Sequence, residues 1–363
     1  YILMKIRDRY IAKTLLSYTL VVLIVWLSIY SFFNFLAELN SVGEGHYTIL
    51  SAFKYIIFQF PEVAYSQASI VILLGSILGM GHLATTGQLL ILRVSGSSIF
   101  KITAITLKNA LIFLLVFIVI GEFLGPISSK FSENVRSSSI NGASESFNQE
   151  GFWIRDGDNF INVKKNIDAR IFTGITVIEV NSSNKIERVI KSKDAIFDGK
   201  SLKMIDSEIF SINDSSLFDN ISLKERNSYN KTVSFDQDLI DSLEKKPKDL
   251  TTWTLIKQIQ FFSDNKLRSR IFETELYKRL IKPISLVAMI LLAMLFIFGS
   301  TRDVTLGRKI FLGIALGLSF ELLSRIASAM ALSFEFNPLM ISMLPSILVI
   351  FISTALLIQK SSH

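Results

Sequence analysis

Charged side chains interrupt stretches of this sequence that are otherwise apolar, and they are its best candidates for chemistry. Glu321 and Arg325 are four residues apart, so they would share one face of a helix and could pair. Lys278, Arg279 and Lys282 form a basic cluster at the start of another apolar stretch. An ionisable group in hydrocarbon is costly unless it faces a partner or water. Two interpretations stay open: neutralisation or headgroup contact within a helical bundle, and binding of an anionic substrate.

The sequence lacks the motifs of nucleotide hydrolysis and of metal catalysis. It contains no G-x-x-x-x-G-K-[ST] loop and no H-E-x-x-H, and its three histidines are scattered at His46, His82 and His363. The absence of cysteine excludes disulfides and Cys-based zinc or redox sites. The run from Gly79 to Ala84 mimics a dinucleotide fingerprint, but it ends an apolar stretch and does not follow a strand. We therefore expect no catalytic residue, no metal and no cofactor.

Six apolar stretches would position the charged groups. Each is close to the ~20 residues that a helix needs to cross ~30 Å of hydrocarbon. Three stretches precede about 150 polar residues and three follow them, which predicts an α-helical membrane protein with six transmembrane helices (3+3) and one inserted domain. The pairs Gly75 and Gly79, and Gly313 and Gly317, have the small-xxx-small spacing that lets helices pack closely. The stretches are residues 15–37, 56–81, 102–124, 281–299, 309–333 and 339–358.

The distribution of lysine and arginine predicts the orientation in the membrane. The connections that contain Arg93 and Lys101, and Arg302 and Arg308, are basic, whereas the opposite short connections contain only Lys54. Basic loops stay in the cytoplasm, so the insert should lie outside it. The net charge of +7 then reflects membrane topology and not binding of nucleic acid.

The insert is predicted to be an all-β, jelly-roll-like domain. Short segments rich in β-branched and aromatic residues alternate with turn signals such as Asp156-Gly157 and Asp198-Gly199. Their regular spacing favours a sandwich or jelly roll, and the pattern becomes helical again from Thr251 to Arg279. The expected strands are residues 160–163, 171–180, 187–190, 195–197, 202–205 and 232–235. The expected domains are residues 1–125 (helices), 126–275 (the β domain with its connecting segments) and 276–363 (helices).

A short segment between the second and third apolar stretches, residues 85–96, has an unusual composition. It is too short to cross a membrane and too apolar to lie uncovered in water. Two interpretations stay open, a docking helix for a cytoplasmic partner and an interfacial helix that lies on the bilayer.

Five segments together resemble one known family, the LptF/LptG permease subunits of the lipopolysaccharide export ABC transporter of Gram-negative bacteria. The resemblance covers essentially the full length of the chain, and its strength lies in the order, spacing and placement of the segments on the 3 + insert + 3 plan. Residues 151–157 favour the LptG branch over the LptF branch. The segments are residues 8–14, 95–96, 121–126, 151–160 and 283–299.

This resemblance implies a multi-pass protein of the inner membrane with its β domain in the periplasm. An LptF-like permease would pair with the chain and enclose a cavity for lipopolysaccharide. An LptB-like ATPase dimer would hydrolyse ATP, and an LptC-like single-span protein would receive the lipid. Residues 85–96 would be the coupling helix that docks on the ATPase, through Gln88, Leu89, Leu92, Arg93, Ser95 and Gly96.

The resemblance also implies a lipopolysaccharide-binding site. Arg136 matches a family position near the glycolipid phosphates, whereas the family's lysines at the outer end of the first span fall on Asn34, Asn40 and Ser41. The acidic residue of the family's coupling helix is Gln88 here. We hypothesise that Arg325 and the cluster around Lys282 partly replace the missing lysines. The expected binding residues are Trp26, Tyr30, Phe33, Asn34, Arg136, Lys282, Glu321 and Arg325.

Two other classes of function stay open. One is a membrane enzyme that modifies lipids, which the lack of a convergent His/Asp/Ser set opposes. The other is a permease-like scaffold that transports nothing. Transport of lipid during ATP hydrolysis would separate a scaffold from an exporter.

Overall fold

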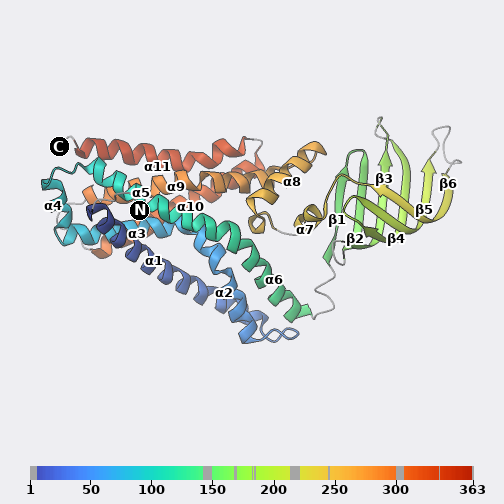
Figure 1. Cartoon of the computed structure of the whole chain (residues 1–363), viewed down its shortest axis with the longest axis horizontal. Helices are drawn as coiled ribbons and strands as arrows, with labels where there is room; N and C mark the ends of the chain where they lie inside the picture. Colours follow the sequence, from blue (N-terminus) through green and yellow to red (C-terminus); the bar gives the residue numbers. More distant parts are fainter. Residues whose placement is uncertain are drawn as a thin grey trace. The chain divides into compact units, whose positions relative to one another are not determined.

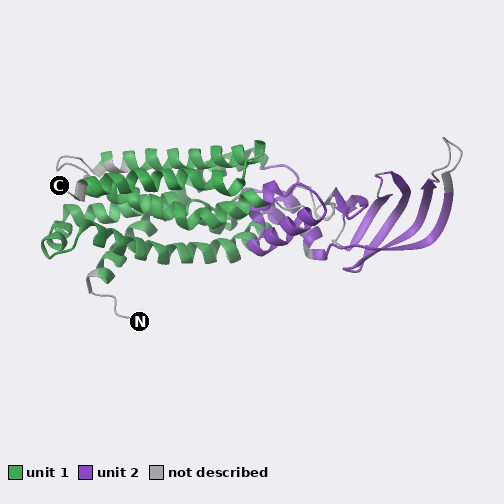
Figure 2. Cartoon of the chain, turned by 90° about the horizontal axis from the view of Figure 1, so that it is seen from above, with its two compact units in different colours: residues 1–41, 52–132, 273–363 green, residues 42–51, 133–272 purple. Residues whose placement is uncertain are grey.

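The chain forms two compact units (Figure 2). Unit 1 comprises residues 1–41, 52–132 and 273–363, and unit 2 comprises residues 42–51 and 133–272. The computed structural model describes residues 6–141, 149–166, 170–181, 183, 185–212, 221–243, 246–299, 306–334 and 336–361.

Among the residues that the structure describes, six helical segments are long and apolar enough to cross a membrane, which confirms the predicted number of spans. They are residues 8–41, 68–85, 99–140, 270–298, 311–333 and 338–359. The second predicted stretch, residues 56–81, is divided between two helices, because Gln67 leaves the helical conformation at φ −90° and ψ 4°. The helices of this part of the chain (Figure 1) are α1 (Ile6–Glu38), α2 (Ile49–Ser66), α3 (Ala68–Thr85), α4 (Gln88–Val94), α5 (Ile99–Val119), the π-helix η2 (Ile120–Leu124), α6 (Gly125–Asn141), α9 (Arg270–Gly299), α10 (Leu306–Ser333) and α11 (Pro338–Ser361).

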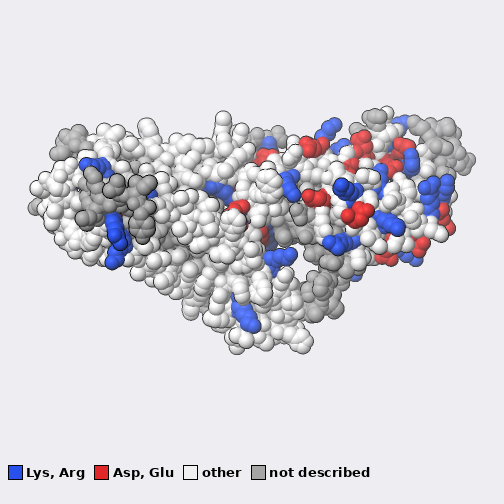
Figure 3. Space-filling model, viewed as in Figure 1, with Lys and Arg blue, Asp and Glu red and all other residues white. Residues whose placement is uncertain are grey.

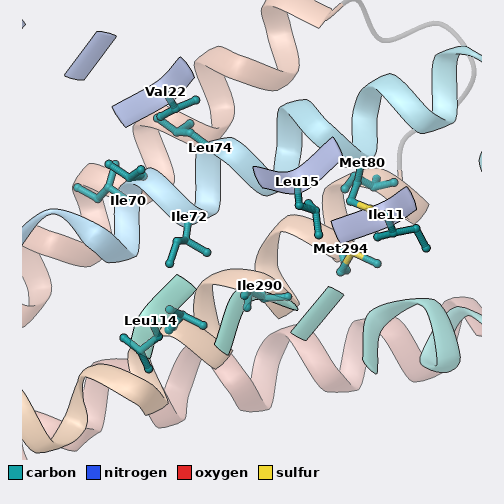
Figure 4. Close-up of a cluster of buried hydrophobic side chains, with 14 of the residues drawn as sticks. Ile11, Leu15, Val22, Ile70, Ile72, Leu74, Met80, Leu114, Ile290 and Met294 are labelled. Atoms are coloured by element: carbon teal, nitrogen blue, oxygen red, sulfur yellow. The ribbon is translucent and has the colours of Figure 1, made fainter. Parts of the chain in front are cut away.

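Helix α3 is the centre of unit 1, because 78% of its residues are buried. Glycines let it approach both neighbours closely, since they remove side-chain volume at the contact. A Cβ atom on Gly75 would lie 2.8 Å from the Thr19 Cα atom of α1, and one on Gly317 of α10 would lie 3.2 Å from the Leu73 side chain. The buried cluster of Figure 4 combines side chains of α1, α3, α5 and α9, including Ile11, Leu15, Ile72, Met80, Leu114, Ile290 and Met294.

The insert contains one six-stranded antiparallel sheet in which every strand pairs with its neighbours in sequence (Figure 1). This confirms a β domain in the insert, and the order β1-β2-β3-β4-β5-β6 makes its sheet an up-and-down sheet. Inward-facing side chains alternate along the strands, as the burial of Ile161 and Val163 in β2 shows. The strands are β1 (Gln149–Asp156), β2 (Asn159–Asn166), β3 (Ile171–Val180), β4 (Ile186–Phe197), β5 (Ser201–Ile212) and β6 (Ile221–Thr232).

The strands differ from the predicted ones at an interior strand and at both edges of the sheet. Residues 187–190 and 195–197, predicted as two strands, belong to the single strand β4. The prediction missed β1 and placed the last strand at residues 232–235, whereas β6 ends at Thr232. Polar, exposed side chains dominate β6, so it lacks the apolar alternation that identifies a half-buried strand.

A row of phenylalanine rings forms the core of unit 2. Successive ring centroids lie between 5.1 and 6.4 Å apart, at the spacing of favourable aromatic pairs. The row begins in the sheet and continues through α8 (Thr252–Asp264), beside the short helix α7 (Gln237–Leu243). Charged side chains gather over the strands, whereas the visible surface of the helices is largely uncharged (Figure 3). The rings belong to Phe152, Phe172, Phe197, Phe235, Phe261, Phe262 and Phe272.

Candidate functional site

Helix α4 occupies the middle of the predicted docking segment, and glycines set both of its ends. Gly87 precedes it at φ +74° and Gly96 follows it at φ +83°, which is the left-handed region that favours glycine. The Ser95 hydroxyl donates to the Leu92 carbonyl at 2.9 Å, and the Ser98 side chain caps the start of α5 by accepting from the Lys101 N–H. These turns hold α4 as a separate short helix between α3 and α5.

The two faces of α4 have different environments. Leu89 is 5% exposed and Leu92 packs against the helical core. Leu90, Ile91 and Val94 point outward and are 64%, 67% and 81% exposed. The sequence prediction named the inward pair and missed the outward three, although both sets follow from a period of 3.6 residues once one face is assigned to the core.

The polar residues of α4 also divide by environment. Arg93 is exposed beside the outward aliphatic side chains, and Ser95 and Gly96 are exposed at the end of the helix. The Oε1 atom of Gln88 is instead buried, and it has no hydrogen-bond partner in the part of the chain that the structure describes. The carbonyl end of Gln88 therefore faces the protein interior.

The basic cluster of α9 is largely neutralised by carboxylates of the same unit. Arg279 is 9% exposed and its Nη1 atom lies 3.2 Å from a carboxylate oxygen of Glu122, which η2 carries. Glu275 lies 3.9 Å from Arg279 and 3.6 Å from Lys278. Glu122 and Arg279 are 157 positions apart in the sequence, so no local sequence pattern could predict that they pair.

Lys282 lies at the break between α2 and α3. Its Nζ atom donates to the Ser66 carbonyl at 3.0 Å and lies 4.2 Å from the centre of the Tyr65 ring. Gly121 of η2 packs against this ring, because a Cβ atom on Gly121 would collide with the ring atoms of Tyr65. Lys282 therefore helps to satisfy a helix end and holds one aromatic side chain.

Glu321 and Arg325 of α10 form the predicted pair. The Arg325 Nε donates to the Glu321 carboxylate at 3.1 Å. Arg325 exposes 70% of its side chain and Glu321 exposes 28%. Both lie within the apolar helix Phe311–Ser333, so an exposed cation stands on a membrane-spanning surface.

The predicted binding residues of α1 differ in their contacts and in their exposure. Tyr30 donates its hydroxyl to the Gln59 side chain at 2.7 Å, and Asn34 donates to the Tyr30 carbonyl at 2.9 Å. Trp26 packs against the buried core, whereas Phe33 is 65% exposed. Phe33 is thus the predicted α1 residue with the most apolar surface available to a lipid.

Arg136 belongs to unit 2, unlike the other predicted binding residues. It lies on α6 and is half-buried. Among the other predicted binding residues, Glu321 and Arg325 pair within unit 1, and Lys282 contacts Ser66 and Tyr65 in the same unit. Among the described residues, no group of three His, Cys, Asp or Glu side chains is arranged to hold a metal ion.

Six apolar helical spans and an inserted antiparallel sheet define a multi-pass membrane protein with a β domain. Residues 9–359 match the model of the family described as lipopolysaccharide export system permease LptF/LptG, and the chain belongs to this family. It is 25% identical over 356 residues to the lipopolysaccharide export system permease protein LptG of Escherichia coli K12, with 98% of each chain covered. It is 26% identical over 354 residues to the LptG protein of Haemophilus influenzae, with 97% of this chain and 98% of the relative covered.

Proposed function

We propose that the chain is a permease subunit that extracts lipopolysaccharide from the periplasmic leaflet of the inner membrane and passes it to a periplasmic acceptor. Membership of the LptF/LptG family and the printed names of the relatives support the substrate. An LptF-like second permease completes the cavity, and an LptC-like single-span protein receives the lipid. The β domain lies in the periplasm, as the charge distribution of the short connections predicts.

The outward aliphatic face of α4 carries the proposal that a partner ATPase drives export. Leu90, Ile91 and Val94 present a compact apolar patch on the side of the membrane where lysine and arginine are most frequent in the connections. Such a patch on a rigid short helix fits a groove in a partner. The buried face of α4 and its connection to α3 give ATP-driven motion a route into the helical bundle. We place the ATPase contact on this outward face.

The lipid site is proposed to combine charged and apolar surfaces of unit 1. Arg325 and Lys282 bind phosphate groups of the glycolipid, because guanidinium and ammonium groups form strong charge-assisted hydrogen bonds with phosphate. Phe33 and Trp26 line the path of the acyl chains.

The test is reconstitution with the paired permease, the ATPase dimer and the acceptor in proteoliposomes that contain lipopolysaccharide. We expect ATP-dependent release of lipopolysaccharide to the acceptor. Val94→Asp should reduce ATPase association by about tenfold, because it places a charge in an apolar contact of the size that interface hot spots have. Val94→Leu is the matched control and should retain both association and release.

Two results would contradict the proposal separately. A complex that hydrolyses ATP but moves no lipid would favour a scaffold over an exporter. Normal ATPase association in Val94→Asp would remove α4 as the docking element but leave the transported substrate untouched.

A further inference from the structure

Arg325 has more hydrogen-bonding capacity than its partner in the protein uses. A guanidinium carries five N–H donors in a rigid fork, and the Nε donor is taken by Glu321 at 3.1 Å. Among the described residues, no protein acceptor lies within reach of the two terminal NH₂ groups. The residue lies about 12 Å along the helix axis from Ser333, the outer end of the apolar segment. A charge exposed at this depth requires water or an anionic group beside it.

Glu321 is the partner of Arg325 on the same helix. Its carboxylate accepts the hydrogen bond from the Arg325 Nε atom at 3.1 Å. Glu321 therefore supplies the negative charge beside Arg325, one of the cations that the proposed function assigns to lipid binding.

Arg279 of α9 forms a buried ion pair in the same unit, with which the exposed pair of Arg325 can be compared. It is 9% exposed, and Glu122 and Glu275 lie 3.2 and 3.9 Å away. Breaking a buried pair leaves an uncompensated charge and is strongly destabilising. Arg325 is 70% exposed and Glu321 is 28% exposed, so this pair is less enclosed than the pair of Arg279 with Glu122.

We propose that Glu321 is a counter-ion that the phosphate group of the transported lipid displaces from Arg325, and that Glu321 pairs with Arg325 again when the lipid leaves. The inference rests on the proposed function, because it takes the phosphorylated headgroup as the ligand. Phosphate that accepts two parallel hydrogen bonds from the Nε–H and one terminal N–H of Arg325 takes the Nε donor that Glu321 uses. Competition by Glu321 lowers the affinity for phosphate and thereby promotes release. Glu321 is thus a positioning residue that limits how long the lipid stays bound.

The test compares binding and release by the full complex in nanodiscs. The probes are lipid A with both phosphate groups and the same lipid with its phosphates removed. Glu321→Gln should bind the phosphorylated lipid about two- to fivefold more tightly, the range expected from loss of an exposed competing pair. It should bind the dephosphorylated lipid as the native protein does and should release phosphorylated lipid more slowly after ATP addition. The matched control is Glu208→Gln, the same change at an exposed position of β5, which should alter nothing.

A second pair of variants tests whether Glu321 competes with phosphate for Arg325 or instead supports phosphate binding by Arg325. Arg325→Gln should weaken binding of the phosphorylated lipid, and adding it to Glu321→Gln should abolish the gain. Glu321→Asp should change affinity in the same direction as Glu321→Gln by a smaller factor, and its assembly with the paired permease on size exclusion reports folding.

Each contrary result has its own meaning. Weaker binding by Glu321→Gln, with phosphate discrimination intact in the native protein, would show that Glu321 orients Arg325, and would overturn the counter-ion role alone. Equal binding of both lipids by native protein and by Arg325→Gln would overturn the proposed phosphate site together with the counter-ion role.

Discussion

Substitution of Gly75 by alanine tests whether the contact between α1 and α3 depends on the absence of a side chain. Alanine is preferred over glycine inside a helix by about 1 kcal/mol. At Gly75 the new methyl group would lie 2.8 Å from the Thr19 Cα atom, and this backbone atom cannot move away as a flexible side chain would. Overpacking of this kind costs about 1–3 kcal/mol. The net effect should therefore be a destabilisation of about 0–2 kcal/mol.

Gly81 is the matched control because it lies on the same buried helix. A Cβ atom there would meet no heavy atom within 4 Å in the described structure. Gly81→Ala should therefore stabilise the protein by the helix propensity alone, about 1 kcal/mol. The difference between the two variants, about 1–3 kcal/mol, is the quantity to measure, since the propensity cancels.

The assay is the apparent thermal unfolding of the detergent-solubilised full chain, followed by the loss of monodisperse protein on size exclusion. Gly75→Ala should unfold several degrees below Gly81→Ala, at about 2–4 °C for each kcal/mol. Gly79→Ala should fall between them, because its Cβ atom would make ordinary contacts at 3.4 Å with Leu15. Equal unfolding temperatures for the first two variants would refute the close approach of α1 and α3.

Two further predictions concern unit 2. Hydrogen bonds from the Lys200 N–H, the Ser201 N–H and the Ser201 hydroxyl lower the pKa of Asp198 below 3.8. Its stabilising effect is therefore complete above that pH and disappears as the pH falls through the lower pKa of the folded state. The stability lost by Asp198→Asn at pH 7 should vanish in acid, and a difference that stays constant with pH would contradict this. Phe235→Ala should destabilise the sheet by about 3–5 kcal/mol, because the ring is 3% exposed. Hydrogen exchange of the strands in the full chain measures the loss. The control is Trp153→Ala, at a ring that is 64% exposed, which should change protection from exchange little.

The spans and the ends of α4 could be predicted because each depends on local composition. A run of apolar residues is enough to identify a membrane helix, and glycine on either side is enough to end a short one. The inward and outward faces of α4 could also have been assigned, since Leu89 and Leu92 are three residues apart and follow a buried helix. That step needed the knowledge that α3 is central to the bundle.

Other features could not be predicted because they depend on tertiary contacts. Glu122 and Arg279 meet through the packing of η2 against α9, and neither residue's neighbours indicate the partner. Strand β6 is held by its backbone pairing with β5, while its polar side chains resemble those of a loop. Side-chain patterns record burial, so a strand that is paired but exposed leaves little trace in the sequence.

The nearest-neighbour order of the sheet has a consequence for how the insert folds during synthesis. Each strand pairs with the one that precedes it in sequence, so a growing chain can add strands one at a time without closing long loops. The phenylalanine row extends from the sheet into α8 only when Phe261 and Phe262 have been made. A nascent sheet would therefore stay poorly consolidated until α8 emerges, and chains that stall before residue 264 should be the species most open to proteolysis.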